Sequence, residues 1–257
     1  MRIEARGLSL ALGARTVLSG LDFLALPGEL TAVIGPNGAG KTTLIKALCG
    51  LRPAAAGTVL LDGRAMAEWQ PRQRARALAY LPQERVVHWA LTARRVVALG
   101  RLPHQPMGAG ESPADAHAIA AALAAMDIGH LADRPVLEMS GGERARVLVA
   151  RCLAQEPAAL LADEPAAGLD PAHQLTLFHH LRDLAQAGRT VVVALHDLSL
   201  AARFCHRIVL LRSGRAVAAG TPEEVLTAEH LAAVYGIKAR HSTVDGVPFV
   251  LATDVLP

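Results

Sequence analysis

The sequence predicts a mixed α/β fold with a mostly parallel sheet, and three observations point to it. A short apolar segment at 30–34 precedes a glycine-rich loop, and a helical pattern at 43–49 follows and is closed by Gly50. Two further continuous apolar segments, 158–162 and 190–195, are typical of strands that are buried on both faces. Helical periodicity between these segments gives the strand and helix alternation of a parallel sheet.

The glycine-rich loop fits the pattern G-x-x-x-x-G-K-[ST] at every fixed position. Glycines let the backbone curl so that successive N–H groups face a phosphate chain, and the following helix adds partial positive charge. Lys41 would reach the β- and γ-phosphates, and Thr42 would offer its hydroxyl to Mg²⁺. We therefore expect a phosphate-binding loop rather than a turn with a chance lysine. Its residues are Gly35, Pro36, Asn37, Gly38, Ala39, Gly40, Lys41, Thr42 and Thr43.

The segments before and after this loop predict a small antiparallel sheet beside it. Short strands are expected at 3–12, 16–18 and 21–26, because Gly13, Gly20 and Pro27-Gly28 separate them. Beyond the loop, 58–63 and 78–83 have the composition of further strands.

The pattern becomes helical from about residue 84 to residue 155. Helices are expected at 91–99 and 114–126, with a loop rich in Pro and Gly at 101–113. A helix at 171–186 follows, with Asp170 as N-cap and Pro171 in its first turn. A hairpin about Ser213-Gly214, a short helix after Thr221 and two weak strands from Lys238 complete the prediction.

We expect one domain over 1–257 that is divided into three parts. These are a catalytic core at 1–84 and 156–220, an inserted helical subdomain at 85–155 and a C-terminal extension at 221–257.

Composition narrows the class of protein. The 257 residues carry a formal net charge of +3, and their basic residues are scattered, so no nucleic-acid partner is expected. Three distant cysteines without metal spacing argue against a disulfide framework. The sequence has no signal-peptide pattern and no apolar run near the ~20 residues of a membrane helix. We expect a soluble chain whose membrane role, if it has one, needs a partner.

Two acidic residues follow the apolar segment 158–162. Ligands of open α/β sheets bind at the carboxyl ends of strands, so Asp163 would hold Mg²⁺ and Glu164 would polarise or deprotonate a water molecule. The alternative is an exposed acidic pair that only caps the strand.

A second glycine turn, Ser140-Gly141-Gly142, precedes Glu143 and a helix at 144–154. Its backbone N–H groups and the helix dipole would attract an anion. The alternative is an ordinary N-cap serine with a glycine turn.

The order and spacing of these motifs resemble the ATP-binding-cassette (ABC) ATPases over essentially the whole chain. The motifs are the phosphate loop, Gln83, Ser140-Gly141-Gly142, Asp163-Glu164 and His196. The Ser-Gly-Gly turn is the specific part. The segment Leu91-Thr92, followed by 96–104 with Gly100, Arg101 and His104, resembles the subfamily that energises import of iron chelates, haem and cobalamin.

This resemblance implies roles for individual residues. Gln83 would contact Mg²⁺ and water, and otherwise is a solvated loop glutamine. Asp170 would lie in a loop that crosses a dimer interface, and is also the helix N-cap. His196 would sense the γ-phosphate, and otherwise is a packed residue at a strand end. Glu164, His196 and Gln83 are thus the expected catalytic residues, and Thr42, Gln83 and Asp163 the expected Mg²⁺ ligands.

The resemblance further implies ATP and Mg²⁺ as cofactors and a homodimer with ATP between the phosphate loop of one subunit and the Ser-Gly-Gly turn of the other. It implies a peripheral place on the cytoplasmic face of the inner membrane, with an integral-membrane permease and, indirectly, a substrate-binding protein as partners. We expect Tyr80 and residues 86–89 to help dock the permease; the alternative is that Trp89 packs inside the helical subdomain.

Three positions depart from the usual family pattern. Glu143 stands where glutamine is common, Gly168 stands in the loop before Asp170, and Leu12 occupies the place of an adenine-stacking aromatic residue. The alternatives to a transport ATPase are a DNA-repair or translation-type ATPase of the same superfamily and a small-molecule kinase. Lys41 and Ser140 are 99 residues apart (140 − 41) without heptads, which disfavours the coiled coils of the DNA-repair type.

Overall fold

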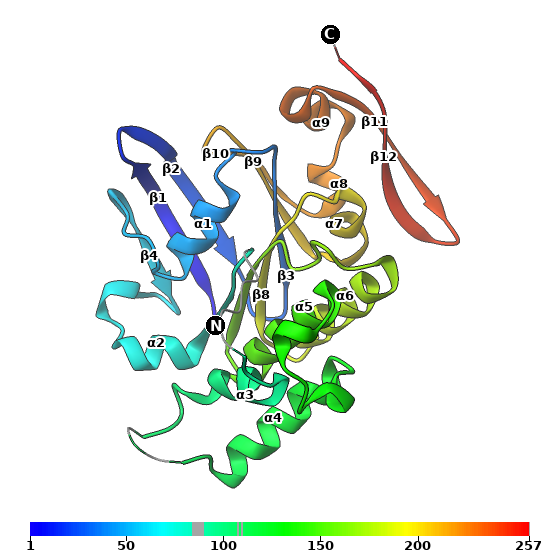
Figure 1. Ribbon diagram of the computed structural model, residues 1–257. Helices are drawn as coiled ribbons and strands as arrows, with labels where there is room; N and C mark the ends of the chain where they lie inside the picture. Colours follow the sequence, from blue (N-terminus) through cyan, green and yellow to red (C-terminus); the bar gives the residue numbers. More distant parts are fainter. Residues whose placement is uncertain (84–89, 107, 109, 257) are drawn as a thin grey trace. The chain divides into compact units, whose positions relative to one another are not determined.

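The computed structural model describes residues 1–83, 90–106, 108 and 110–256, which pack as two compact units (Figure 1). One unit combines 1–68 with 181–257, and the other is 69–180. Residues 86–89, which we expected to help dock a permease, lie outside the described part. Among the described residues, no helix has the length and apolarity needed to cross a membrane.

An antiparallel sheet opens the first unit, with strand order β2-β1-β4-β5. The predicted break at Gly20 is wrong, because β2 continues through it. Gly20 has a φ of 58° and donates its N–H to Ser9 Oγ at 2.9 Å, so the strand absorbs it as a bulge. The strands are β1 (Ile3–Leu12), β2 (Arg15–Ala25), β4 (Ala56–Leu61) and β5 (Arg64–Ala65).

A second set of strands in the same unit is mostly parallel, and one of them leads into the phosphate loop. β3 (Leu30–Ile34) lies between β8 (Thr190–Ala194) and β9 (Arg207–Arg212) and is parallel to both, while β10 (Arg215–Gly220) pairs antiparallel with β9. Every residue of β3 and β8 is buried, as their mostly apolar sequences predict.

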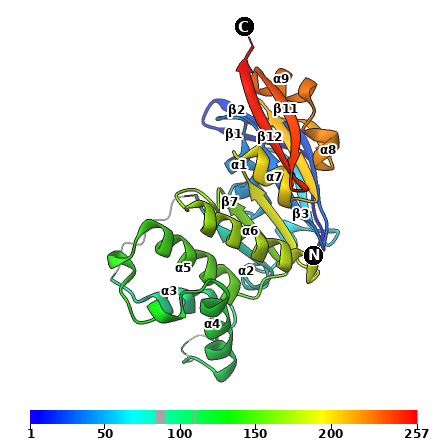
Figure 2. The ribbon, with the colours of Figure 1, turned by 90° about the vertical axis from the view of Figure 1, so that its right-hand side faces the viewer.

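Helices and a separate hairpin complete this unit. The hairpin runs beside α7 and α9 in both ribbon views (Figures 1 and 2). The sequence did not indicate α7 and α9, which are short. The elements are α1 (Lys41–Leu48), η1 (Met66–Glu68), α7 (Leu198–Phe204), α8 (Pro222–Val225), α9 (Ala228–Tyr235), β11 (Ile237–Val244) and β12 (Val247–Val255).

The second unit is mainly helical around one parallel strand pair, β6 (Leu78–Leu81) with β7 (Ala159–Asp163). Its helix α5 (Gly141–Ala154) packs against α3 (Ala93–Ala98) and α4 (Pro113–Ala125), as Figure 2 shows. The remaining elements are α2 (Pro71–Ala77), η2 (Leu99–Arg101), η3 (Gly129–Leu131), η4 (Val136–Glu138) and α6 (Pro171–Gln186), which continues into the first unit. The predicted fold class is confirmed: an antiparallel β part, a mostly parallel sheet and an inserted helical part.

Candidate active site

The phosphate loop leaves β3 and enters α1 at Lys41. Lys41 is 6% exposed, and its Nζ donates to the carbonyl oxygens of Gly35 at 2.7 Å and Pro36 at 3.2 Å. The loop thus wraps its carbonyls around its own ammonium group. Such a buried cation inside a curled loop fits the phosphate chain that the motif predicts.

The start of α1 supports the same interpretation. Its N-cap is Gly40, with a φ of 104° and no side chain to satisfy the first N–H groups of the helix. These donors, together with the helix dipole, fit an anionic ligand. Thr42 and Thr43 lie in this first turn, where a hydroxyl can serve as an oxygen ligand for Mg²⁺.

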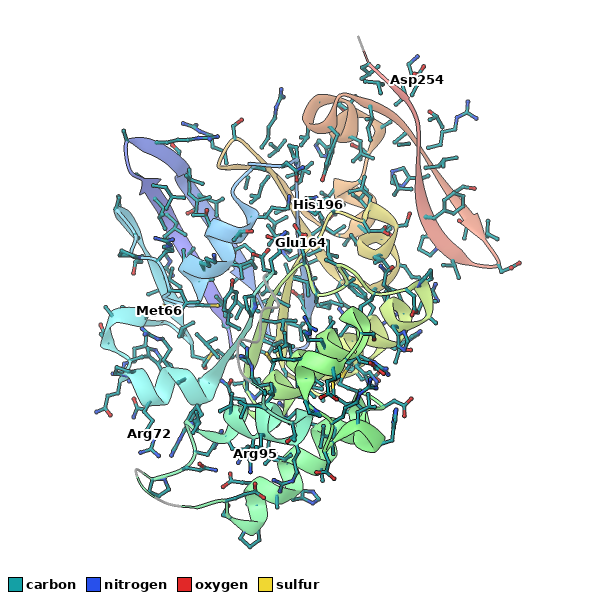
Figure 3. The ribbon with its side chains drawn as sticks, viewed as in Figure 1. Met66, Arg72, Arg95, Glu164, His196 and Asp254 are labelled. Carbon is teal, nitrogen blue, oxygen red and sulfur yellow. The ribbon has the colours of Figure 1, made fainter. Side chains whose placement is uncertain are left out.

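His196 follows β8, the parallel neighbour of β3. The carboxyl ends of these two strands meet at one edge of the sheet, which is the edge where ligands of α/β folds bind. His196 is exposed and directly precedes Asp197, which caps α7 by accepting the N–H of Leu200 at 2.9 Å (Figure 3). His196 therefore lies between the end of β8 and the capped start of α7.

The second unit holds the acidic pair. Asp163 is the last residue of β7 and is 1% exposed, and Glu164 follows it with a φ of 51° (Figure 3). A left-handed backbone is costly for a residue with a side chain, and such strain concentrates at functional sites. Gln83 follows β6, the partner strand of β7, and its Nε2 donates to Glu164 Oε2 at 2.9 Å. The structure thus brings Gln83 and Glu164 together.

The Ser-Gly-Gly turn, called here the signature turn (Ser140, Gly141 and Gly142), opens α5. Ser140 Oγ accepts the N–H of Glu143 at 3.2 Å, and Glu143 Oε2 accepts the N–H of Ser140 at 2.8 Å. The Ser140 backbone N–H that donates to this carboxylate, with the Ser140 hydroxyl as a second cause, holds the pKa of Glu143 below its usual range. The acidic departure at Glu143 thus completes a capping box, which also starts the helix three residues earlier than predicted.

Asp170 caps the helix α6, as predicted. It accepts the N–H of His173 at 3.0 Å through Oδ1, and its Oδ2 lies 2.6 Å from His173 Nδ1. Both contacts lower the pKa of Asp170. Gly168, in the loop before it, has a φ of 71°, so glycine suits this turn.

The motif around Arg101 has a structural explanation that its sequence did not reveal. The buried Arg101 guanidinium donates to Asp115 Oδ1 at 2.8 Å and to Ala154 O and Glu156 Oε2 at 2.7 Å each. A Cβ on Gly100 would lie 2.2 Å from Arg151 O. The motif therefore fixes the far end of α5, the helix that begins at the signature turn. Sequence spacing alone could not show that an arginine there is buried.

Comparisons with known proteins identify the family of the chain. The ABC transporter family matches residues 18–167. A hemin import ATP-binding protein, HmuV, of Pseudomonas aeruginosa is 47% identical over 98% of this chain and 99% of its own. The HmuV of Myxococcus xanthus is 46% identical over 93% of this chain and 92% of its own.

Solved structures give the same result. An ABC transporter described as of the metal-chelate type, in an inward-facing conformation, has a TM-score of 0.84 at 26% identity and covers 98% of this chain and 96% of its own. A dimeric ATP-binding cassette with bound ADP and phosphate has a TM-score of 0.76 at 25% identity, covering 86% of this chain and 98% of its own. The chain belongs to the ABC transporter family, as an ATP-hydrolysing transport ATPase.

Proposed function

We propose that this protein is the ATP-hydrolysing subunit of a membrane import complex whose cargo is haem or a related metal chelate. The observation that carries this proposal is the match, over nearly the full length of both chains, to proteins named for hemin import. Cobalamin and iron chelates other than haem belong to the same chemical class of bulky metal complexes. The uptake experiment given below distinguishes them from haem as the cargo.

Each site residue has a role in this proposal. The N–H groups of the phosphate loop and Lys41 bind the phosphates of ATP, because the loop presents donors and a buried cation. Thr42, Asp163 and Gln83 offer the oxygen ligands that Mg²⁺ prefers, and the metal would neutralise charge on the phosphates.

Glu164 accepts the proton of the attacking water. Gln83 donates a hydrogen bond to the Glu164 carboxylate and so orients that carboxylate. The negative charge of Glu164 therefore activates the water that cleaves the phosphate bond. His196 contacts the γ-phosphate and reports its presence to α7, whose N-cap is the next residue.

We further propose that two copies act together. The signature turn of one copy faces the phosphates that the other copy holds, and the loop with Gly168 and Asp170 lies along the boundary between them. Two features support this: the related cassette with ADP and phosphate is dimeric, and the glycines of the signature turn have open surroundings. Binding of ATP would favour the closed dimer because it adds contacts made only in that state.

The transport role needs partners that cross the membrane. We propose an integral-membrane permease that contacts this subunit from the membrane, a substrate-binding protein on its other side, and a peripheral location on the cytoplasmic face. The names of the relatives support import, and no observation favours a DNA-repair, translation or kinase role.

The test is to purify the protein with its membrane partners, identify the permease, and measure uptake of haem, an iron chelate and cobalamin into vesicles. The proposal predicts ATP-dependent uptake of haem that a Lys41→Ala variant abolishes. Uptake of cobalamin alone would correct the cargo, and a purified complex without any membrane protein would contradict the import role.

A further inference from the structure

The hairpin β11–β12 is attached to the helix that follows His196. Ser199, in the first turn of α7, donates its hydroxyl to Val250 O at 3.2 Å and accepts the N–H of Val250 at 3.2 Å. One side chain thus satisfies both backbone groups at the outer edge of β12. β12 packs along α7 (Figure 1). Phe249 and Val250 of β12 are half-buried.

The base of the same hairpin is joined to α9. Tyr235, the last residue of α9, is half-buried; burial raises its pKa to about 12, and the adjacent main chain of Gly35 opposes the rise. Gly236 ends α9 with a φ of 67° and leads into β11, and Leu256 N–H closes the base on Gly236 O at 2.7 Å. The hairpin is therefore joined to α9 at its base and packs along α7 through β12.

This arrangement constrains His196. α7 has seven residues, and its N-terminus is set by Asp197, which directly follows His196. An isolated helix of this length is not stable in water and needs tertiary contacts to hold it. The paired hydrogen bonds between Ser199 and Val250 provide such a contact within one turn of His196.

We propose that the β11–β12 hairpin positions His196 for ATP hydrolysis, and that Ser199 is the positioning residue through which it does so. The inference rests on the proposed role of His196 at the γ-phosphate. Loss of the Ser199 hydroxyl frees α7 from the hairpin, so His196 takes its catalytic position less often. The phosphate loop keeps its own contacts, so ATP binding is retained.

The experiment compares four variants of the full-length chain in steady-state ATP hydrolysis, with thermal unfolding measured alongside. Ser199→Ala removes both hydrogen bonds to Val250 and should lower kcat about fivefold, because only part of their net stabilisation acts on the position of His196, with KM for ATP within about twofold of wild type. Ser199→Thr keeps a hydroxyl and should restore the rate. Thr253→Ala is the matched control, because among the described residues Thr253 Oγ1 bonds only within the hairpin, to Lys238 O at 3.3 Å; its kcat should equal wild type.

Hydrogen exchange over 198–204 should be faster in Ser199→Ala and normal in Thr253→Ala. Wild-type kcat in Ser199→Ala, even with a lower unfolding temperature, would show that the contact is merely structural and would overturn the inference. An equal fall of kcat in Thr253→Ala would overturn it as well, since any loosening of the hairpin would then suffice.

His196→Ala separates this inference from the proposed function. If His196→Ala is inactive while Ser199→Ala turns over normally, the role of His196 stands and the hairpin does not position it. If His196→Ala hydrolyses ATP at the wild-type rate, the proposed role of His196 fails, whatever Ser199 does.

Discussion

The phosphate loop and the signature turn each place glycines ahead of a helix, but the chain surrounds them differently. In the loop, a Cβ on Gly35 would lie 2.3 Å from Leu211 O, and one on Gly40 would lie 2.8 Å from Leu18 Cδ2. At the signature turn, apart from Gly141's own helix and chain neighbours, no described atom lies within 4 Å of a Cβ on Gly141. For Gly142 the nearest such atom is Leu169 Cδ2, at 3.8 Å.

The difference separates two reasons for glycine. Packing inside the subunit accounts for Gly35 and Gly40, because a side chain there would overlap the backbone or core. Gly38 differs, since its φ of 77° rather than close packing favours glycine. The subunit's own packing does not require the glycines of the signature turn. Their small size is explained if a ligand or a second subunit approaches this surface, as the proposed dimer requires.

The largest effect on hydrolysis is expected for Glu164→Gln. It removes the charge that activates water and keeps the shape and the amide contact with Gln83. We expect hydrolysis to fall by about 10²–10⁴, the usual effect of losing one positioned base, with ATP binding retained. Rates come from phosphate release and affinities from titration of labelled ATP. Turnover near wild type would show that another group is the base.

The comparison itself is tested by matched alanine substitutions. Gly35→Ala should destabilise the fold by about 1–3 kcal/mol, because the added carbon overlaps Leu211 O. Gly141→Ala should leave the unfolding temperature unchanged but lower hydrolysis roughly 10²-fold, because the added methyl group would hold the partner's phosphates away from the backbone N–H donors of the turn.

Calorimetry and phosphate release check the pair. Wild-type turnover in Gly141→Ala would break the comparison, because the open surroundings of that glycine would then have no functional meaning. A Gly35→Ala variant as stable as the wild type would contradict the packing explanation for Gly35.

Leu12 concerns recognition of the adenine base of ATP rather than of its phosphates. Leu12 ends β1 and is 44% exposed, so it offers an apolar face without an aromatic ring. Leu12→Tyr should raise ATP affinity up to roughly tenfold, because base–aromatic stacking contributes about 1–3 kcal/mol. Titrations with ATP and GTP measure the gain. Unchanged affinity would place base recognition elsewhere.

The smallest expected effect concerns acid stability of the signature helix α5. Ser140 holds the pKa of Glu143 below its ordinary 4.5, so the carboxylate stabilises the fold above that pH, and the contribution disappears as pH falls through the lowered pKa. Glu143→Gln keeps an acceptor oxygen but cannot titrate.

We expect Glu143→Gln to cost less than about 1 kcal/mol near neutral pH, the scale of a charge at a helix start. Its difference from wild type should shrink below pH 4.5, the ordinary value for this carboxyl. Urea unfolding at several pH values measures this. A difference that grows in acid would mean that another group causes the pH dependence.

The sequence predicted the parts of the fold that local pattern controls. β3 and α6 have the predicted bounds, because an unbroken apolar run and a proline-started, glycine-ended helix are clear local signals. The break at Gly20 was wrong because a bulge, which depends on the partner strand, can absorb a glycine. α7 escaped prediction because its seven residues depend on the hairpin contact, which is distant in sequence.

The same distinction between local pattern and distant contact applies to the site residues. The loop and the acidic pair follow from motif and strand order, and the spacing from Ser140 to Glu143 could have signalled the capping box. The hydrogen bond between Gln83 and Glu164 and the buried ion pair of Arg101 join residues far apart in the chain. No local pattern indicates such pairs, so only the folded structure reveals them.

The most direct test of the central claim, that two copies share each ATP, is the mass of Glu164→Gln in solution with and without Mg²⁺-ATP. We expect saturating ATP to double the mass measured by light scattering, because hydrolysis no longer opens the dimer. Adding Ser140→Arg to Glu164→Gln should prevent the doubling, since its side chain fills the place of the partner's γ-phosphate. An unchanged mass for Glu164→Gln at saturating ATP, or a doubled mass that survives Ser140→Arg, would contradict the shared site.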